Sequence, residues 1–374
     1  MFFAKNIKNI YISILALIFL LRLESFNRSS ILFKIFIPFL AFSILTMSMS
    51  INDDYFFISI QKTISFSLTI LVLPLMFVKL YVDNKNEFVK KIVFFVFFIL
   101  LIGLFFRYLA PEVAMLNGSR YRGVFGGPNG LGVFCVLFFI VFFIFNNYHS
   151  DIFSRRERVL IFGIIIISLV WSGSRNALIA IFIFYTFQRF FGMSPFLGFL
   201  IFIVLLFVSE LISSNAASII NALGLGEYFR VQTLEEGSGR LIAWGFAWKQ
   251  IQHNFFIGKG FAYNEFYMRQ HYGMLEKLGH QGGIHNSFLT FWFDQGLVGL
   301  LIYMRSYILL FIKAAKKTKF AFPAMFAISF TAFFESWLVG SLSAFAFMGI
   351  FIFTILTSDE IIPQETEVVP AIAE

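Results

Sequence analysis

The chain has 374 residues, of which 59% are hydrophobic and 13% are charged, and it contains 57 phenylalanines. A soluble domain of this length cannot bury so much apolar surface. The net charge of +8 lies in short basic clusters between apolar runs, whereas a nucleic-acid interface needs basic residues gathered on one face. Composition therefore excludes a soluble enzyme and a nucleic-acid binder, and it indicates a polytopic membrane protein.

Apolar runs long enough to span a bilayer recur along the chain and predict an all-α fold of about 11 transmembrane helices, with roughly 10 to 12 as the range. In chain order the runs are 9–22, 31–49, 57–79, 92–109, 129–146, 159–172, 176–191, 195–213, 286–311, 321–338 and 340–357. Residues 1–357 are predicted to form one transmembrane domain. The polar, acidic segment 358–374 is predicted to be a disordered cytoplasmic tail.

The charges of the loops predict the orientation of the helices. Basic clusters favour the cytoplasmic side, and Asp53 and Asp54 occupy a loop without basic residues. Alternation from the second span onward then predicts the inner loops 79–91, 147–158, 190–195 and 312–320 and the outer loops 107–128, 172–176 and 214–285. The side of the N-terminus stays open, because Lys5 and Lys8 oppose Arg22, Arg28 and Lys34. No small-residue cleavage site follows the first run, so we expect a retained span.

The large outer loop 214–285 is predicted to contain a helix. Leu241, Trp244, Trp248 and Ile251 recur at helical spacing. Such a helix suits the membrane surface, with its tryptophans at headgroup depth. It suits equally a helix that packs on the transmembrane bundle for stability, and the two interpretations are compatible.

Four arginines fall in the predicted outer segments, and they predict a cationic pocket on the outer face: Arg120, Arg122, Arg175 and Arg240. Ionisable residues beside lipid are costly and usually line a polar site. Arg240 follows Ser238 at a helix start, where free N–H groups favour an anion. Guanidinium groups match phosphate oxygens in pairs. Outer acids such as Glu227, Glu235, Glu236, Glu265 and Glu276 offer the alternative that some of these arginines are simply ion-paired.

Polar residues at the starts of two spans are further candidates. Asn129 follows two glycines that let a ligand approach the backbone, and His285 opens a span beside Asn286. An imidazole suits general-base work, although His285 could instead be hydrogen-bonded to backbone. The other four histidines are predicted to be solvated. Asp294 is predicted to lie below His285 on a similar face, where it would orient or balance the site.

The sequence predicts neither a metal nor a cofactor. No histidine pair has metal-ligand spacing, Cys135 is the single cysteine, and no dinucleotide or phosphate-loop motif occurs. Phosphate chemistry in this chain would therefore be neutralised by arginine.

The polar residues form an ordered set of motifs, which are Arg-x-Arg-Gly-x-Phe-x-x-Pro-Asn (120–129), Ser-x-Ser-Arg (172–175), Ser-Gly-Arg-x-x-x-Trp (238–244), Gly-x-Gly (258–260) and His-Asn-x-Phe-Leu with Gly296 and Gly299 (285–299). In this order the motifs resemble those of the O-antigen ligase and Wzy polymerase superfamily of bacterial surface-polysaccharide assembly. The similarity covers about residues 105–310.

This resemblance implies a GT-C-like helical fold and an inverting, metal-independent glycosyltransferase of the bacterial inner membrane, with its site on the periplasmic face. The donor would be a glycan on undecaprenyl diphosphate. Arg175 and Arg240 would hold the diphosphate and His285 would assist the acceptor hydroxyl. The expected supporting residues are Arg120, Arg122, Asn129, Ser238, Asn286 and Trp244.

The leading interpretation is a polymerase that joins lipid-linked repeat units, with a chain-length regulator and a flippase as possible partner proteins. One alternative is a ligase that transfers finished glycan to lipid A–core. Another is a flippase or other transporter of lipid-linked glycan, in which the arginines bind the substrate and no bond is made.

Overall fold

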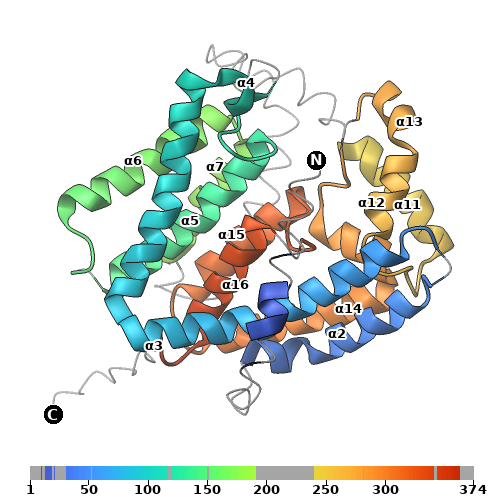
Figure 1. The fold of residues 1–374 in the computed structure, drawn as a ribbon, viewed down its shortest axis with the longest axis horizontal. Helices are drawn as coiled ribbons and strands as arrows, with labels where there is room; N and C mark the ends of the chain where they lie inside the picture. Colours follow the sequence, from blue (N-terminus) through green and yellow to red (C-terminus); the bar gives the residue numbers. More distant parts are fainter. Residues whose placement is uncertain are drawn as a thin grey trace.

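The computed structural model describes residues 31–51, 53–116, 120–149, 151–190, 240–280, 282–340 and 343–362, with short pieces of the first predicted span (10, 13–18 and 21). These residues are almost entirely helical (Figure 1). The one pair of strands among them joins β1 (Met115–Leu116) to β2 (Arg120–Tyr121) in antiparallel register. The prediction of an all-α fold is confirmed. The predicted span 195–213, Ser238 and most of the C-terminal tail lie outside the described residues.

The helices begin and end close to the predicted apolar runs. The first half of the chain forms α2 (Ile31–Ser48), α3 (Phe56–Leu109), α4 (Pro111–Ala114), α5 (Pro128–Tyr148), α6 (Arg155–Ser172) and α7 (Arg175–Phe190). The second half forms α11 (Arg240–His253), α12 (Tyr263–Gln270), α13 (Tyr272–Lys277), α14 (Ser287–Ala315), α15 (Ala321–Phe334) and α16 (Ala344–Thr357). By length and composition α2, α3, α5 and α14 can each cross a membrane, and α15 and α16 are shorter apolar helices. The chain is thus a multi-pass membrane protein, and the count of about 11 spans stays a prediction.

Two predicted spans are joined in α3. The backbone leaves helical geometry at Lys85 (φ 43°, ψ −119°), and the helix bends there, so the predicted inner loop 79–91 is a kinked helical connection. Figure 1 shows the two limbs of α3 running in different directions. The predicted spans 57–79 and 92–109 thus correspond to the two limbs of one bent helix.

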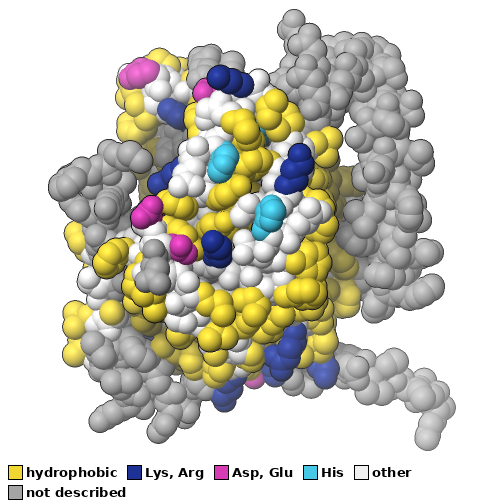
Figure 2. Space-filling model, turned by 90° about the vertical axis from the view of Figure 1, so that its right-hand side faces the viewer, with side chains coloured by type: hydrophobic (Ala, Val, Ile, Leu, Met, Phe, Trp, Pro, Cys, Tyr) yellow, Lys and Arg dark blue, Asp and Glu magenta, His cyan; other side chains and the backbone are white. Residues whose placement is uncertain are grey.

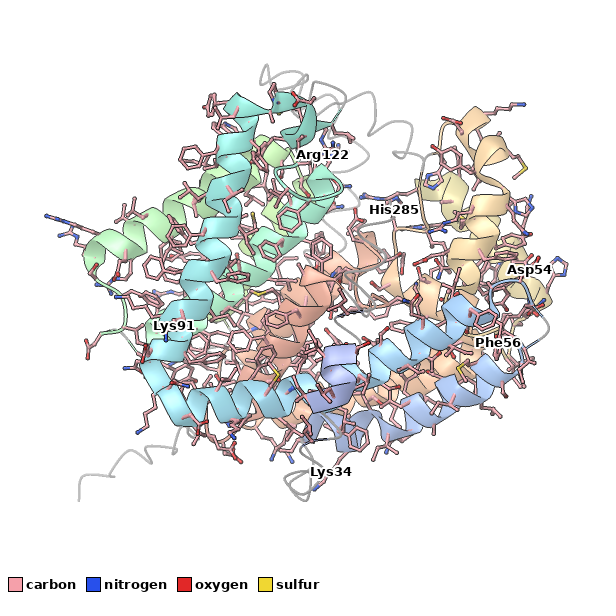
Figure 3. The ribbon with its side chains drawn as sticks, in the orientation of Figure 1. Lys34, Asp54, Phe56, Lys91, Arg122 and His285 are labelled. Carbon is pink, nitrogen blue, oxygen red and sulfur yellow. The ribbon has the colours of Figure 1, made fainter. Side chains whose placement is uncertain are left out.

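Contacts between loops divide the bundle into two ends. Residues from the predicted inner loops meet in the pairs Tyr81–His149, Lys90–Glu157, Tyr148–Thr318 and Lys317–Asp359. In a second group, Arg120 and Arg240 of the predicted outer segments meet residues at the ends of predicted spans, in the pairs Arg120–Asn129 and Arg240–Glu335, and Arg120 also contacts Ser172 of an outer loop. Following the predicted topology, we call these groups the inner end and the outer end. Figure 3 shows Lys91 well separated from Arg122 and His285.

The core is built around α5, which packs against α6, α7 and α16. Phenylalanine rings fill it edge to face, as Phe142 does with Phe153 and Phe162, an arrangement that aromatic quadrupoles favour. Cys135 is fully buried there, in keeping with a small hydrophobic role. Because this core is apolar, the polar functional candidates lie at the ends of the helices.

Candidate active site

The carboxylate of Glu335 is the centre of a polar cluster at the outer end. α15 ends at Phe334, and Glu335 begins the segment that leads to α16. Asn129 Nδ2 donates a hydrogen bond to Glu335 Oε1 at 2.9 Å, and Arg240 Nη2 donates to the same oxygen at 3.2 Å. His285 Nδ1 lies 3.0 Å from Oε2. Helix starts far apart in the sequence, those of α5, α11 and α14, therefore meet at one carboxylate.

Arg120 extends this cluster toward the turn between α6 and α7. Its Nη2 donates to Asn129 Oδ1 at 3.1 Å and to the Ser172 carbonyl oxygen at 2.9 Å. α6 ends in a left-handed cap at Gly173 (φ 57°), a conformation that glycine adopts without strain. α7 begins directly after this turn, at Arg175. The turn that carries Arg175 is thus hydrogen-bonded to the residues that surround Glu335.

Arg122 has different partners from Arg120. Its Nε donates to the Val113 carbonyl oxygen at 2.9 Å, and its Nη2 reaches the carbonyl oxygen of Glu112 at 3.4 Å. Arg120 and Tyr121 form the extended strand β2, and the guanidinium of Arg122, the next residue, binds the end of α4 and not the Glu335 cluster. Arg122 therefore stabilises the position of α4 relative to β2 and does not contribute its guanidinium to the Glu335 cluster.

Trp244 and Asn286 hold the chain around His285. Trp244 Nε1 donates to the Ile284 carbonyl oxygen at 2.9 Å. The side-chain oxygen of Asn286 accepts from Leu289 N at 2.9 Å and caps α14. Both residues lie beside the site as the sequence suggested, and both use these polar atoms to fix the protein backbone.

The ring of His285 has a defined orientation. Its Nδ1 faces the Glu335 carboxylate, which accepts but cannot donate, so the neutral ring carries its proton on Nδ1. Nε2 is then the basic nitrogen, and no hydrogen bond to it occurs among the described residues. The sequence left open that His285 is hydrogen-bonded to the backbone. For Nδ1 that alternative is wrong, because its partner is the Glu335 carboxylate.

The cluster of described residues contains one carboxylate among several guanidinium groups. The side chain of Glu335 is only 16% exposed. Burial raises the pKa of its carboxyl group, but the hydrogen bond from His285, the charge of Arg240 and the hydrogen bond from Asn129 together hold that pKa below its usual value. Glu335 is therefore a buried carboxylate ion, and it compensates one of the surrounding guanidinium charges.

The sequence reasoning missed the role of Glu335. It placed Glu335 inside a span and sought partners for the arginines among the outer acids, of which Glu265 instead pairs with Lys62. Arg240 finds its partner 95 residues further along the chain. The available signal was the carboxylate itself, since an acid within an apolar run is costly and usually marks a site.

Two other sequence expectations are corrected by the structure. Asp294 does not balance His285, because its carboxylate accepts from the backbone N–H groups of Ala262 and Asn264 and from the Asn264 amide. His280 was expected to be solvated but is only 3% exposed. Its ring packs edge to face against His285, with the centroids 5.9 Å apart.

The predicted helix of the outer loop exists as α11. Its buried face consists of Ala243, Ala247 and Ile251, while Leu241 and Trp248 are exposed. The helix packs on α14, which agrees with a bundle-packed helix and leaves an apolar outer face that suits the membrane surface. Figure 2 shows this side of the molecule, where charged side chains and histidines lie among hydrophobic ones.

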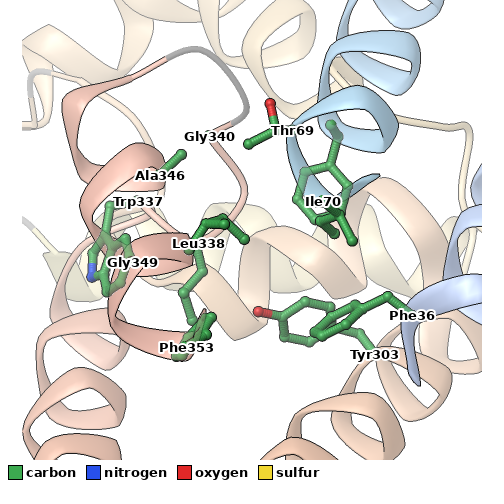
Figure 4. Close-up of a pocket in the computed structure, with 12 residues that line it drawn as sticks. Phe36, Thr69, Ile70, Tyr303, Trp337, Leu338, Gly340, Ala346, Gly349 and Phe353 are labelled. Atoms are coloured by element: carbon green, nitrogen blue, oxygen red, sulfur yellow. The ribbon is translucent and has the colours of Figure 1, made fainter. Parts of the chain in front are cut away.

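An apolar cavity lies next to the segment that follows Glu335. Trp337, Leu338 and Gly340 form one wall, and helices α2, α3, α14 and α16 supply the rest, including Phe36 and Tyr303 (Figure 4). The chain of the polar cluster thus continues directly into the lining of an apolar space within the bundle.

We expect Gly282→Ala to lower turnover about 10²-fold, because misplacing a reacting group by about 1 Å has effects of that size. A Cβ at Gly282 would lie 2.9 Å from His285 Nε2, and the φ of +122° strains any residue with a side chain. The measurement is the rate of product formation by purified variant and parent protein.

Gly279→Ala is the matched control for this prediction. Gly279 also has a positive φ (+85°), but a Cβ there meets no atom within 4 Å. Strain without the contact should leave turnover within a few-fold of the parent. Equal losses in the two variants would mean that the contact with His285 is irrelevant.

The fold and the cluster define a class of protein: a helical multi-pass membrane protein with an arginine–carboxylate–histidine cluster at one end of its bundle. Among the described residues no group of three or more histidine, cysteine, aspartate or glutamate side chains is placed to hold a metal ion.

A family model described as O-antigen ligase matches residues 160–304. This segment includes Arg175, Arg240 and His285, and the match confirms the resemblance to the O-antigen ligase and Wzy superfamily. A search of curated proteins gives no match.

Proposed function

We propose that the chain is a metal-independent inverting glycosyltransferase, which joins repeat units carried on undecaprenyl diphosphate at the periplasmic face of the bacterial inner membrane. The observation that carries this proposal is the Glu335 cluster, in which Asn129, Arg240 and His285 meet on one carboxylate. A basic nitrogen and cationic groups at one place are what a hydroxyl acceptor and a diphosphate leaving group require.

His285 acts as the general base. Nδ1–H is held by Glu335, so Nε2 takes the proton from the acceptor hydroxyl as its oxygen attacks the anomeric carbon. The imidazolium that forms is stabilised by the Glu335 carboxylate. Glu335 itself needs no proton, because His285 and Arg240 keep its pKa low against the opposing effect of burial.

The arginines receive the charge of the leaving group. The bond between the anomeric carbon and the diphosphate oxygen breaks, and undecaprenyl diphosphate departs with the bonding electrons. Arg240 and Arg175 bind the phosphate oxygens, and Arg120 supports them by holding the Ser172–Gly173 turn. Arg240 and Arg175 each begin a helix, and the helix dipole adds to their attraction for the anion.

The surroundings suit a lipid-linked donor. The outer face of α11, with Leu241 and Trp248 exposed, rests at headgroup depth. Chain-length regulator and flippase proteins are the expected partners of such an enzyme.

A ligase is the second candidate, and the description of the matching family favours it. In that case the acceptor is lipid A–core and not a second lipid-linked unit. The same cluster serves both reactions, because donor and leaving group are identical.

The deciding experiment is incubation of the purified protein in proteoliposomes with lipid-linked repeat units, followed by separation of the products by length. A polymerase yields a ladder of longer lipid-linked chains, and a ligase yields product only when lipid A–core is added. Transport of intact units with no change in length in either arm would reject the enzyme and favour a flippase.

A further inference from the structure

The outer loop contacts α14 at a break in that helix. Gly296 leaves helical geometry (φ 72°, ψ 178°), and the chain segment 254–260 pairs with the backbone on both sides of it. Leu297 N donates to the Phe255 carbonyl oxygen at 2.8 Å, Val298 N donates to that of Phe256 at 3.1 Å, and Gly260 N donates to that of Asp294 at 2.8 Å. Segment 254–260 of the outer loop, which is irregular and not helical, therefore lies along α14.

Two glycines make this close approach possible. A Cβ at Gly258 would lie 2.2 Å from the Asp294 carbonyl oxygen, and one at Gly296 would lie 2.5 Å from the Phe256 carbonyl oxygen. Any side chain at either position would push the two backbones apart. We call the contact between segment 254–260 and residues Asp294 to Val298 of α14 the seam. Glycine is needed at positions 258 and 296 because of this contact, and the proposed chemistry uses neither residue.

The contact between segment 254–260 and α14 lies within the apolar run 286–311 of the sequence. The inner end of α14 is marked by Lys313 and its following basic residues, and Asp294 to Val298 precede Lys313 by 15 to 19 positions in the sequence. At about 1.5 Å per residue the seam is roughly 22–28 Å from the inner charges, inside a hydrocarbon core of about 30 Å. Segment 254–260 belongs to the outer loop, yet it contacts a part of α14 that falls within the predicted span 286–311.

The surface of the seam is apolar. Phe256 is 65% exposed and Ile257 is 45% exposed. On α14 the neighbouring exposed residues are Val298 and Leu301, and Val298 is the residue that hydrogen-bonds to Phe256. The exposed apolar side of a spanning helix is therefore continuous with Phe256 and Ile257.

Two carbonyl groups of the segment, those of Phe255 and Phe256, are paired with donors on α14. Unpaired N–H and C=O groups are excluded from hydrocarbon, so irregular backbone survives there only with internal partners. The Phe255 carbonyl oxygen accepts from Leu297 N and also from Trp292 Nε1, at 3.1 Å. The Phe256 carbonyl oxygen accepts from Val298 N.

We propose that residues 254–258 form a re-entrant segment, which enters the outer half of the bilayer from the outer loop and presents Phe256 and Ile257 to lipid acyl chains. The Gly258–Gly296 contact anchors it to α14. The proposal is independent of the chemistry proposed above, because it concerns only which solvent surrounds this surface.

Nitroxide labels at Phe256→Cys and Ile257→Cys test the proposal in the full-length protein reconstituted in liposomes. The measurement is the ratio of spin relaxation by oxygen, which concentrates in lipid, to relaxation by a water-soluble nickel chelate. Leu301→Cys on the exposed side of α14 is the lipid reference, and Lys277→Cys at the end of α13 is the aqueous reference. Cys135 is fully buried and is left in place.

We expect the ratio at both test positions to match that of Leu301→Cys and to exceed that of Lys277→Cys several-fold. A ratio equal to that of Lys277→Cys would overturn the proposal, because the segment would then be in water. Low accessibility to both reagents would also overturn it, since protein would cover the surface. Two test positions guard against the failure of one variant to fold, and neither readout needs activity.

Discussion

His285→Ala is expected to lower the rate of glycosyl transfer about 10²–10⁴-fold, the range that a general base contributes. Affinity for the lipid diphosphate should change little, because the imidazole acts on the acceptor. The measurements are the initial rate of chain extension in proteoliposomes and the binding of donor to the purified variant. Unimpaired turnover would remove His285 from the mechanism.

Glu335→Gln should lose about 10²-fold or more in rate, although it keeps the shape of the site. The carboxylate faces donors from Asn129 and Arg240 at one oxygen and from His285 at the other. If the glutamine oxygen accepts from Asn129 and Arg240, its NH₂ group must face Nδ1. That arrangement moves the ring proton to Nε2 and abolishes the base.

Glu112→Gln is the matched control for this variant, because Glu112 is an exposed acid at the same end of the bundle. It should retain the parent rate. A normal rate in Glu335→Gln, with the variant folded and in the membrane, would mean that the carboxylate has only a structural role.

Arg240→Ala is expected to lose about 10²–10³-fold in turnover, the effect of removing one donor to a developing anion. Donor affinity should also fall, because the guanidinium binds the diphosphate before and after the bond breaks. Arg175→Ala should behave in the same way. Arg240→Lys should recover little, since an ammonium group cannot make the paired hydrogen bonds of guanidinium.

Arg122→Ala is the comparison for these variants. Arg122 lies at the same end but binds the carbonyl oxygens of Val113 and Glu112. We expect a rate within a few-fold of the parent for Arg122→Ala, with product chains of normal length. The assignment of Arg240 would be rejected if Arg240→Ala and Arg122→Ala bound the donor equally well.

The ion pair between Arg240 and Glu335 bears on how a diphosphate binds. Arg240 is held by an anion before the donor arrives, so part of its hydrogen-bonding capacity is already used. A guanidinium has five N–H donors, and the contact to Glu335 engages Nη2. The remaining donors are available to phosphate oxygens, while Glu335 fixes the direction of the side chain.

The sequence by itself determined the helical class of this protein. A helix that spans a membrane appears in the sequence as a long apolar run. Its backbone N–H and C=O groups are hydrogen-bonded within the helix, and its side chains face lipid or other apolar helices along its whole length. The bounds of α2, α5, α7 and α14 accordingly lie within a few residues of the predicted runs. The positions of Arg175, Arg240 and His285 at helix starts were likewise readable, because a polar residue stands out against an apolar background.

Only the tertiary structure decided which of these groups meet. Glu335 lies 50 residues from His285 and 95 from Arg240, and no local pattern links such distant positions. Arg120 and Arg122 are two residues apart, yet one binds the turn before α7 and the other the end of α4. Asp294 is near His285 in sequence but is held by the start of α12. Charged groups at buried sites take the partners that the packing of helices brings within reach, and that packing is a property of the whole chain.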